Sequence, residues 1–581
     1  MRPVSRSRHH RLALVAMATG AAALALVARL AAVQVLDAPR YAAYAAGEVR
    51  SQVALPGIRG AIYDRSGRLL AASLPRVDVV ADDFLVAHPA RVAAELAPLL
   101  HATAARIEPL LSERSGYVVV DYHATDALEA KVAALGLPGI SFVADPLRRY
   151  FGGSLLEPLL GGVHALVPGE AASASGDAGI EYMENRLLAG RSGHEVLAES
   201  AGGDPLPARA EDVVPPTEGD GVVLTIDEPL QAQATRDVAA EMARTGARSG
   251  VAIVEDVHTG DILAMVDLVR GRHGAAVPAA TNLAATSVYQ PGSVMKIATF
   301  SFALQDHLIT PDTVFSVPFE LQIGGYWFQD AEFHPTQPMP AYQILAQSSN
   351  IGTIEVSRRL GPERLYGALR ALGFGRPTGL GWPGASPGII GSPATWYGSD
   401  LGSIPIGTGE GVTALQILDA FTTVADGGVA HAPSLVAATI SPAGQEHEIP
   451  PKPGRRILKP STVTRLVPMF GGVVQDGTAV CAAVPPYTVA GKTGTAQVVN
   501  PSGNGFVPGD WNATFVGFLP AQAPQLSAIV WLNHPQPIYG GSVSAPVFAR
   551  IMGWAARHFD VAVPPGRDTQ AQTMPAICNG A

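Results

Sequence analysis

The longest run of apolar residues in the chain lies close to the N-terminus. It extends from Leu12 to Leu36 and holds one charged residue, Arg29. A run of this length spans the hydrocarbon core of a bilayer as a helix, and Arg29 lies near its far end, where a long side chain reaches the interface. Basic residues precede the run at Arg2, Arg6, Arg8 and Arg11. The positive-inside rule then places the N-terminus in the cytoplasm and everything after the run outside.

A cleaved signal peptide is the alternative interpretation of this segment. The run is longer than the apolar region of a typical signal peptide, and no small-residue cleavage site ends it. We therefore expect a cytoplasmic tail over residues 1–11, a single-pass membrane anchor over 12–36 and an extracytoplasmic remainder.

Shorter and less regular patterns follow the anchor. The sequence predicts a hairpin, with strands at 61–63 and 69–70 joined by the turn Asp64-Arg65-Ser66-Gly67. Residues 74–215 mix short helical and strand patterns, such as a helix at 89–100 that starts with proline and a strand at 116–121. No catalytic constellation stands out there. A segment rich in proline, glycine and acidic residues, 204–221, indicates a boundary, so we expect one domain over 37–218.

From Val222 the chain changes character. The pattern predicts a strand at 222–226, a helix at 229–244 and two strands at 250–254 and 261–266 around a Thr259-Gly260 turn. Residues 293–304 are almost wholly apolar, which is typical of a helix buried on all sides. Further predicted elements are antiparallel strands at 487–489, 496–499, 513–519 and 526–532, and a closing helix at 545–558.

These elements predict an α+β fold. Strands at the two ends of the segment with helices between them favour an antiparallel sheet flanked by helices. We expect this second domain to cover 219–562, and a loosely ordered tail to follow over 563–581.

Composition narrows the possible functions. The net charge is -10 and no basic stripe occurs, which argues against a nucleic-acid partner. Histidines are scattered without a His-Glu-x-x-His helix, and two cysteines are too few for a zinc site, so neither a metal nor another cofactor is expected. Cys481 and Cys578 fall in the exported region, where they either pair as a disulfide or remain two unpaired thiols.

Lysine is rare in this chain, with five lysines against thirty-five arginines. Arginine replaces lysine as a surface charge but cannot act as a base. Lys296 ends the motif Ser293-Val294-Met295-Lys296, and Lys492 begins Lys492-Thr493-Gly494. Between them lies Ser348-Ser349-Asn350. Ser-x-x-Lys, Ser-x-Asn and Lys-Thr-Gly in this order are the signature motifs of penicillin-recognising serine enzymes.

The first motif predicts an activated nucleophile. A three-residue spacing puts Ser293 and Lys296 on one face of a helix. A serine hydroxyl attacks only when a nearby base takes its proton. A buried Lys296, kept neutral partly by the charge of Lys492, is that base. The alternative, a capping serine with a surface lysine, conflicts with a helix that offers Lys296 no polar face.

The other two motifs predict the remainder of the catalytic machinery. Lys492 and Thr493 bind a substrate carboxylate, while Gly494, on an edge strand, lets a substrate backbone approach. Backbone N–H groups of Ser293 and Thr495 form an oxyanion hole. The alternative for this motif is an ordinary strand with a glycine bulge.

In the second motif we expect Ser348 to relay a proton between Lys296 and the leaving nitrogen. Asn350 would hold Lys296 or the substrate amide. A helix-capping loop is the alternative.

With these motifs in place, the chain resembles the class B penicillin-binding proteins over nearly its whole length. The resemblance also rests on 59–67 after the anchor, on 179–181 with 190–193 in the pedestal, on 224–227, and on 407–409 with 412–416. The family implies a monofunctional D,D-transpeptidase that cross-links peptidoglycan stem peptides outside the membrane and is acylated by β-lactams at Ser293. The chain departs from the family pattern at two places. Tyr289-Gln290 stands where many members have Phe-Glu, and residues 255–258 replace a more usual Asp-Pro-Lys turn.

Two details resemble the septal branch of the family more than the elongation branch: Ser349 and the segment 539–548. They imply work at the division site on stem peptides and lipid-linked precursors, beside a membrane glycan polymerase and division-complex proteins. An elongation role remains the alternative. A β-lactamase or carboxypeptidase would need a glutamate that activates water, which we cannot identify. A β-lactam sensor would normally carry further membrane segments and a signalling domain.

Overall fold

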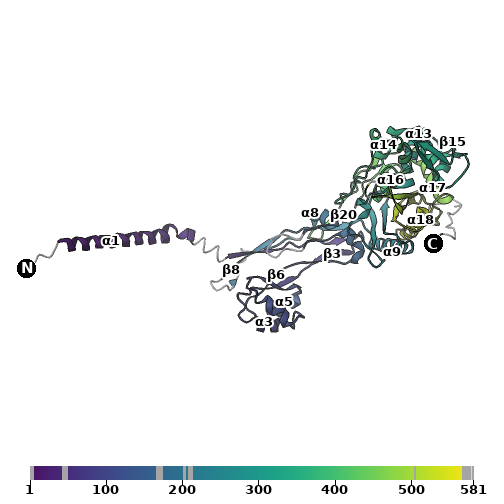
Figure 1. The fold of residues 1–581 in the computed structure, drawn as a ribbon. Coiled ribbons are helices and arrows are strands. Elements are labelled where there is room, and N and C mark those ends of the chain that lie inside the picture. The colour runs from purple at the N-terminus through teal and green to yellow at the C-terminus, as the bar shows by residue number, and fades with distance from the viewer. Residues whose placement is uncertain are drawn as a thin grey trace, which may run out of the picture. The chain divides into compact units, whose positions relative to one another are not determined.

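The computed structural model describes residues 6–41, 50–164, 175–199, 205–206, 213–500, 502, 505–564 and 578. Its contacts divide the chain into two compact units. The first comprises the described residues up to Ile58 and between Arg191 and Thr217, and the second comprises the rest. Figure 1 shows the elements of both units with the labels used below.

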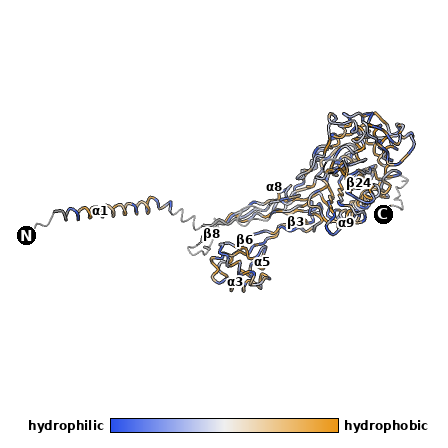
Figure 2. The backbone as a smooth tube through the Cα atoms, viewed as in Figure 1, coloured by the Kyte–Doolittle hydropathy of each residue, from blue (hydrophilic) through white to orange (hydrophobic). Residues whose placement is uncertain are grey.

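The first unit begins with the predicted apolar helix. It is α1 (Arg6–Ala31), continued by η1 (Ala32–Leu36). Most of its large apolar residues, among them Leu12, Leu24 and Leu36, are exposed. Figure 2 shows hydrophobic residues, in orange, along this helix. Among the described residues it is the one helix long and apolar enough to cross a membrane, and it fits a single-pass anchor.

A small antiparallel sheet completes the first unit. In it β1 (Arg50–Leu55) pairs with β8 (Gly193–Glu199), which also pairs with β9 (Pro205–Leu206) and β10 (Val213–Val214).

The second unit opens with the predicted hairpin, β2 (Ile62–Tyr63) and β3 (Leu69–Leu74). Asp64 forms the turn, because its carboxylate accepts hydrogen bonds from the backbone N–H groups of Ser66 and Arg68 over 2.9 and 2.8 Å. The hairpin belongs to a six-stranded sheet that also holds β7 (Leu147–Tyr150), β11 (Gly221–Leu224), β20 (Val436–Ile440) and β21 (Glu446–Glu448). Because β11 pairs parallel to β2, this sheet joins strands from both sides of the predicted boundary at 218.

A three-stranded sheet with its own small core follows the hairpin. It consists of β4 (Val77–Ala81), β5 (Val118–Ala124) and β6 (Ile140–Ala144), covered by α3 (Pro89–Leu96), α4 (Ala104–Leu110) and α5 (Asp126–Ala133). The expected helix at 89–100 starts correctly but ends four residues early. The expected strand at 116–121 is shifted by two to three residues.

A buried cluster of charged residues connects the segments 59–67 and 179–181, in which the resemblance to the family was noted. Glu181, on α7 (Gly179–Met183), accepts from Arg59 Nε at 2.5 Å and from Arg148 Nε at 2.7 Å. Arg59 also donates to Asn185, on α8 (Asn185–Leu188), over 2.7 Å. Loss of one partner from such a cluster leaves an uncompensated buried charge. Arg59 and Glu181 lie in two of the segments that resemble the family. We interpret their role as stabilising this part of the fold rather than as catalysis. The remaining helix of this part is α6 (Glu157–Leu160).

The predicted antiparallel sheet is confirmed. Its order is β14-β13-β12-β25-β24-β23, and every neighbouring pair is antiparallel. The strands are β12 (Ser249–Asp256), β13 (Ile262–Arg270), β14 (Ala276–Pro278), β23 (Ala490–Val499), β24 (Phe506–Leu519) and β25 (Leu526–Asn533). The third motif lies on β23, an edge strand, as expected.

One predicted strand of this sheet is wrong. Residues 487–489 connect a turn to the strand and are not part of it: the turn is Pro485-Pro486, across which Tyr487 N–H donates to the carbonyl of Val484. The Tyr487 hydroxyl instead donates to Val561 O over 2.7 Å. The strand starts at Ala490 and continues through the motif to Val499.

Helices pack against the sheet. α18 (Gly540–His558) contacts β24, β25 and α9 (Glu228–Thr245), and α16 (Ala414–Ala425) also contacts β24 and β25. α17 (Pro460–Gln475) packs on β23 and on α11 (Lys296–Gln305). Other helices are α10 (Leu283–Thr286), α12 (Ala341–Ala346), α13 (Asn350–Leu360), α14 (Pro362–Ala371) and α15 (Asp400–Ser403). Short strand pairs are β15 (Val314–Val317) with β18 (Gln337–Pro340), β16 (Glu320–Ile323) with β17 (Tyr326–Gln329), and β19 (Val429–Ala430) with β22 (Arg455–Arg456).

The two cysteines form a disulfide. Cys481 follows α17, in η7 (Val480–Ala482), and its Cα lies 5.4 Å from that of Cys578. Of the predicted flexible tail, 563–581, only Val563, Pro564 and Cys578 lie within the described residues. The disulfide ties Cys578 to η7, between α17 and β23.

Candidate active site

Ser293 lies in a tight turn rather than in a regular α-helix. The turn is η4 (Gly292–Met295), a 3₁₀ helix that continues directly into α11. Ser293 is partly exposed, whereas Gly292, Val294 and Met295 are buried. The predicted helix at 293–304 is therefore present, but its first turn is wound more tightly and presents the serine hydroxyl at the surface.

Two glycines allow this turn to lie against the edge strand. Gly292 has φ of +63°, and a Cβ there would lie 2.8 Å from Thr495 O. A Cβ at Gly494 would collide with Pro291 O. Gly494 thus makes room for the protein's own backbone. Its expected role in admitting a substrate backbone stays a prediction.

Lys296 connects the first motif to the second. Its side chain is wholly buried, and Nζ donates to Ser348 O over 2.6 Å, to Ser349 O over 3.2 Å and to Asn350 Oδ1 over 3.0 Å. Ser348 Oγ lies 3.3 Å from the same nitrogen. Within the part of the chain that the structure describes, the oxygens hydrogen-bonded to Lys296 Nζ all belong to the second motif.

Burial sets the protonation of this lysine. It lowers the pKa of Lys296 to about 7, against the opposing pull of the Asp330 carboxylate. The pKa of Lys492 lies well below its ordinary value because of burial and then of repulsion by Lys296. Part of the shift of Lys296 was expected to come from Lys492. In the structure the repulsion between the two amines lowers the pKa of Lys492 instead.

The second motif is a strained loop between two helices. α12 ends at Ala346, α13 begins at Asn350, and Ser348 between them has φ of +61°. Ser349 caps α13, since its Oγ accepts from Gly352 N over 2.9 Å. The helix-capping alternative is thus true of Ser349, while Ser348 and Asn350 face Lys296. A non-glycine residue at positive φ is held in place only by its surroundings.

Asp330 and His334 support this loop, and the sequence did not reveal them. Asp330 accepts from Ser349 Oγ over 2.7 Å and from the backbone N–H groups of Asn350 and Ile351 over 2.5 and 3.0 Å. His334 Nε2 lies 3.0 Å from the Asp330 carboxylate. Asp330 precedes Ser349 by 19 residues and comes from the end of the β16–β17 hairpin, so no local spacing links it to the motif.

The third motif lies in the first half of β23, where its residues are buried. Lys492 Nζ is buried and lies 3.3 Å from Thr493 Oγ1. Thr493 Oγ1 is in turn 2.7 Å from Thr478 Oγ1. Thr495 is partly exposed, and its Oγ1 accepts from Gly540 N over 3.3 Å. The structure therefore brings the predicted Ser293, Lys296, Ser348, Asn350 and the Lys-Thr-Gly strand to one place.

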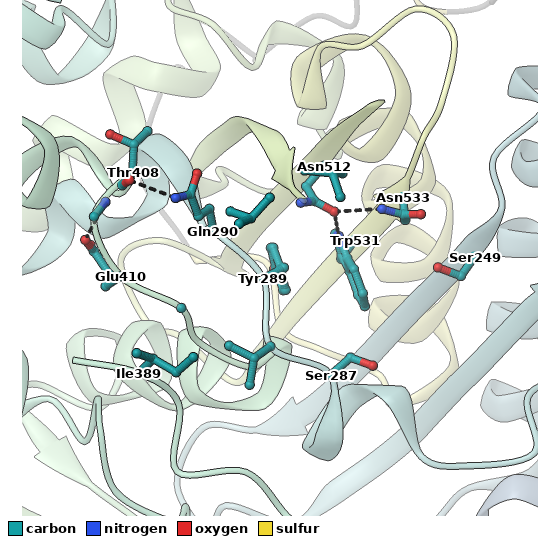
Figure 3. Close-up of a pocket in the computed structure, with 15 residues that line it drawn as sticks. Ser249, Ser287, Tyr289, Gln290, Ile389, Thr408, Glu410, Asn512, Trp531 and Asn533 are labelled. Carbon is teal, nitrogen blue, oxygen red and sulfur yellow. Dashed lines mark hydrogen bonds between the residues drawn. The ribbon is translucent and has the colours of Figure 1, made fainter. Parts of the chain in front are cut away.

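A pocket of about 570 Å³ is lined in part by Tyr289 and Gln290, which directly precede the turn that holds Ser293 (Figure 3). Gln290 Nε2 donates to Thr408 O over 2.8 Å, which ties the turn to the 407–411 loop. The Tyr289 ring stacks on Trp531 with 4.4 Å between centroids. Both departures from the family pattern at this turn are thus accommodated by packing and hydrogen bonding within the protein.

Two family models match the chain. The Penicillin-binding Protein dimerisation domain matches residues 54–224, and the Penicillin binding protein transpeptidase domain matches 250–553. The chain belongs to the class B penicillin-binding proteins. The second match spans all three motifs, so this class B protein carries its candidate catalytic residues within a transpeptidase domain.

Named relatives agree with this assignment. Penicillin-binding protein PbpB of Mycolicibacterium smegmatis is 31% identical over 94% of this chain and 91% of that protein. Peptidoglycan D,D-transpeptidase FtsI of Escherichia coli is 28% identical over 87% of this chain and 84% of its own length. A solved structure of penicillin-binding protein 3 of Mycobacterium tuberculosis, complexed with aztreonam, matches with a TM-score of 0.67 and 28% identity, over 88% of this chain and 98% of that one.

Proposed function

We propose that this class B penicillin-binding protein is a peptidoglycan D,D-transpeptidase that cross-links stem peptides at the division septum, with Ser293 as its nucleophile. The observation that carries the proposal is the environment of Lys296. A buried lysine with a pKa of about 7, three residues after a partly exposed serine and bound by the second motif, has the properties of a general base.

The first half of the reaction is acylation. Neutral Lys296 takes the proton of Ser293 as Oγ attacks the carbonyl before the terminal residue of a stem peptide. Backbone N–H groups of Ser293 and Thr495 bind the developing oxyanion. The C–N bond breaks, Ser348 passes the proton from Lys296 to the leaving nitrogen, and an ester to Ser293 remains.

Recognition of the donor depends on the third motif. Lys492 and Thr493 bind the terminal carboxylate of the stem peptide. Lys492 is buried with a lowered pKa, and an arriving carboxylate stabilises its protonated form. The same contact serves a β-lactam carboxylate. In the second half-reaction an amine of a neighbouring stem peptide attacks the ester, which frees Ser293 and forms the cross-link.

The septal role rests on two supports. Ser349 and residues 539–548 resemble the septal branch, and the relatives include FtsI of Escherichia coli and Stage V sporulation protein D of Bacillus subtilis. We infer that α1 anchors the chain with its N-terminus in the cytoplasm, and that a membrane glycan polymerase and division-complex proteins work beside it. Depletion should give filamentous cells with blocked septa, whereas rounded cells that still divide would favour an elongation role.

Acylation and release test the enzymatic proposal together. Full-length protein is incubated with a fluorescent penicillin, and the labelled band and its decay are followed in the wild type and in Ser293→Ala. We expect a long-lived label on the wild type alone. Rapid release of the label would indicate a β-lactamase, and labelling of Ser293→Ala would disprove the assigned nucleophile.

A further inference from the structure

Thr478 is an exposed residue beside the third motif that the mechanism has not used. It lies in the short connection between α17 and η7. Its hydroxyl oxygen is 2.7 Å from that of Thr493, a distance typical of a strong hydroxyl–hydroxyl hydrogen bond. Thr493 itself is buried. The hydroxyl to which the proposed mechanism assigns the substrate carboxylate thus has a partner from outside the sheet.

Close backbone packing fixes the position of Thr478. A Cβ at the preceding Gly477 would collide with Ala346 O, and Thr478 N–H donates to that same carbonyl. A Cβ at Gly541, in the first turn of α18, would collide with Thr478 O. Ala346 is the last residue of α12, two residues before Ser348. The connection is therefore held between the second motif and the start of α18.

The hydrogen-bonding capacity of Thr493 gives this contact a direction. A threonine hydroxyl has one proton to donate and two lone pairs to accept. Lys492 Nζ donates to Thr493 Oγ1 over 3.3 Å. When the Thr478 hydroxyl donates as well, both lone pairs are occupied. The one proton of Thr493 is then left for an acceptor in the cleft.

We propose that Thr478 is a positioning residue for carboxylate recognition: its hydroxyl donates to Thr493 and so directs the Thr493 proton toward the carboxylate of the donor peptide or of a β-lactam. The proposal rests on the proposed transpeptidase function. Without Thr478, only Lys492 Nζ still donates to the Thr493 hydroxyl, and one of its lone pairs is left without a protein partner. The carboxylate then meets a hydroxyl that is no longer pre-oriented.

The experiment compares a charged with an uncharged ligand. Acylation of full-length wild type, Thr478→Val and Thr478→Ser is measured over a range of concentrations of benzylpenicillin and of its methyl ester. In Thr478→Val we expect about a tenfold or greater loss of acylation efficiency with benzylpenicillin, from loss of a hydrogen bond to a group that binds a charge. It should appear as weaker binding rather than as a lower limiting rate.

The methyl ester separates positioning from a structural role. Its efficiency should change less than about threefold in Thr478→Val, because an ester makes a weaker charge-free contact with Thr493. Thr478→Ser keeps the hydroxyl and should restore benzylpenicillin acylation. Thr464→Val, which alters an exposed threonine of α17 bonded only to its own helix backbone at Pro460, is the matched control and should equal the wild type.

Each remaining outcome overturns a stated claim. Equal losses of acylation efficiency with both ligands would overturn the positioning role of Thr478, and so would wild-type acylation of Thr478→Val by benzylpenicillin. Neither result would affect the proposed transpeptidase function. Absence of wild-type acylation would overturn the proposed function, and this inference with it. If Thr478→Val does not fold, Thr478→Ala is measured in the same way and decides the question.

Discussion

At the scale of single residues, the candidate site combines two buried amines with a carboxylate that supports the loop beside one of them. The scarcity of lysine singled out Lys296 and Lys492, and both are wholly buried. The sequence did not identify Asp330. This residue follows the β16–β17 hairpin and contacts Ser349 only because of the fold, not because of a regular spacing along one helix. A short motif identifies the residues expected to react. The residues that hydrogen-bond to a motif can come from distant parts of the chain, so the motif alone does not identify them.

Replacing Lys296 tests its proposed role as the base most directly. Lys296→Arg keeps a positive charge but cannot accept the proton of Ser293. We expect the variant to fold, as shown by its melting curve, and to lose acylation by a labelled penicillin on the order of a thousandfold or more. Lys131→Arg, Lys452→Arg and Lys459→Arg serve as matched controls and should be nearly silent. Near-normal labelling of folded Lys296→Arg would show that Lys296 is not the base.

The pH dependence of acylation follows from the same lysine. Burial lowers the pKa of Lys296 to about 7, and only the neutral amine accepts a proton. The acylation rate of the wild type should therefore be low in acid, rise with pH and reach half its plateau near pH 7. The Asp330 carboxylate raises this pKa, so Asp330→Asn should move the midpoint to lower pH. A midpoint that moves upward, or a flat profile, would contradict this assignment.

At the scale of elements, alternation and apolar runs located most strands and helices but not their exact ends. The strand predicted at 487–489 failed because the Pro485-Pro486 turn and the Tyr487 hydroxyl bond hold those residues outside the sheet. The helix from Ser293 was placed correctly. Its tight first turn lies against Thr495 of β23, which is distant in sequence, so this contact left no local signal.

The close contact between β23 and the turn that holds Ser293 predicts opposite effects on stability for two glycine substitutions, Gly494→Ala and Gly471→Ala. Gly494→Ala places a methyl group against Pro291 O, so β23 and the nucleophile turn must separate. We expect a loss of about 1–3 kcal/mol in stability and severe loss of acylation. Gly471→Ala, within α17 and with nothing near its Cβ position, should instead stabilise the protein by up to about 1 kcal/mol. Melting curves and penicillin labelling of both variants test this, and a fully active Gly494→Ala would refute it.

At the scale of the whole molecule, one sheet combines strands from both sides of the boundary expected at residue 218. β2 and β11 pair in parallel although they are about 160 residues apart, and β20 joins them from the catalytic segment. Parallel pairing over such a distance leaves no turn signal in the sequence. The composition of residues 204–221 indicates a linker, but it does not indicate that a strand before this segment pairs with a strand after it.

The disulfide is the long-range contact for which the sequence left both outcomes open. Cys481 and Cys578 are 97 residues apart, and in a chain-entropy model closing a loop of this size stabilises the folded state by up to about 4–5 kcal/mol. We expect no thiol labelling of the unreduced, denatured protein, two labelled thiols after reduction, and a lower melting temperature for Cys578→Ser. Because Cys481 lies close to the connection that holds Thr478, penicillin labelling of Cys578→Ser near its melting range should be lost at a lower temperature than in the wild type. Two free thiols in the unreduced protein would show that this bond does not form.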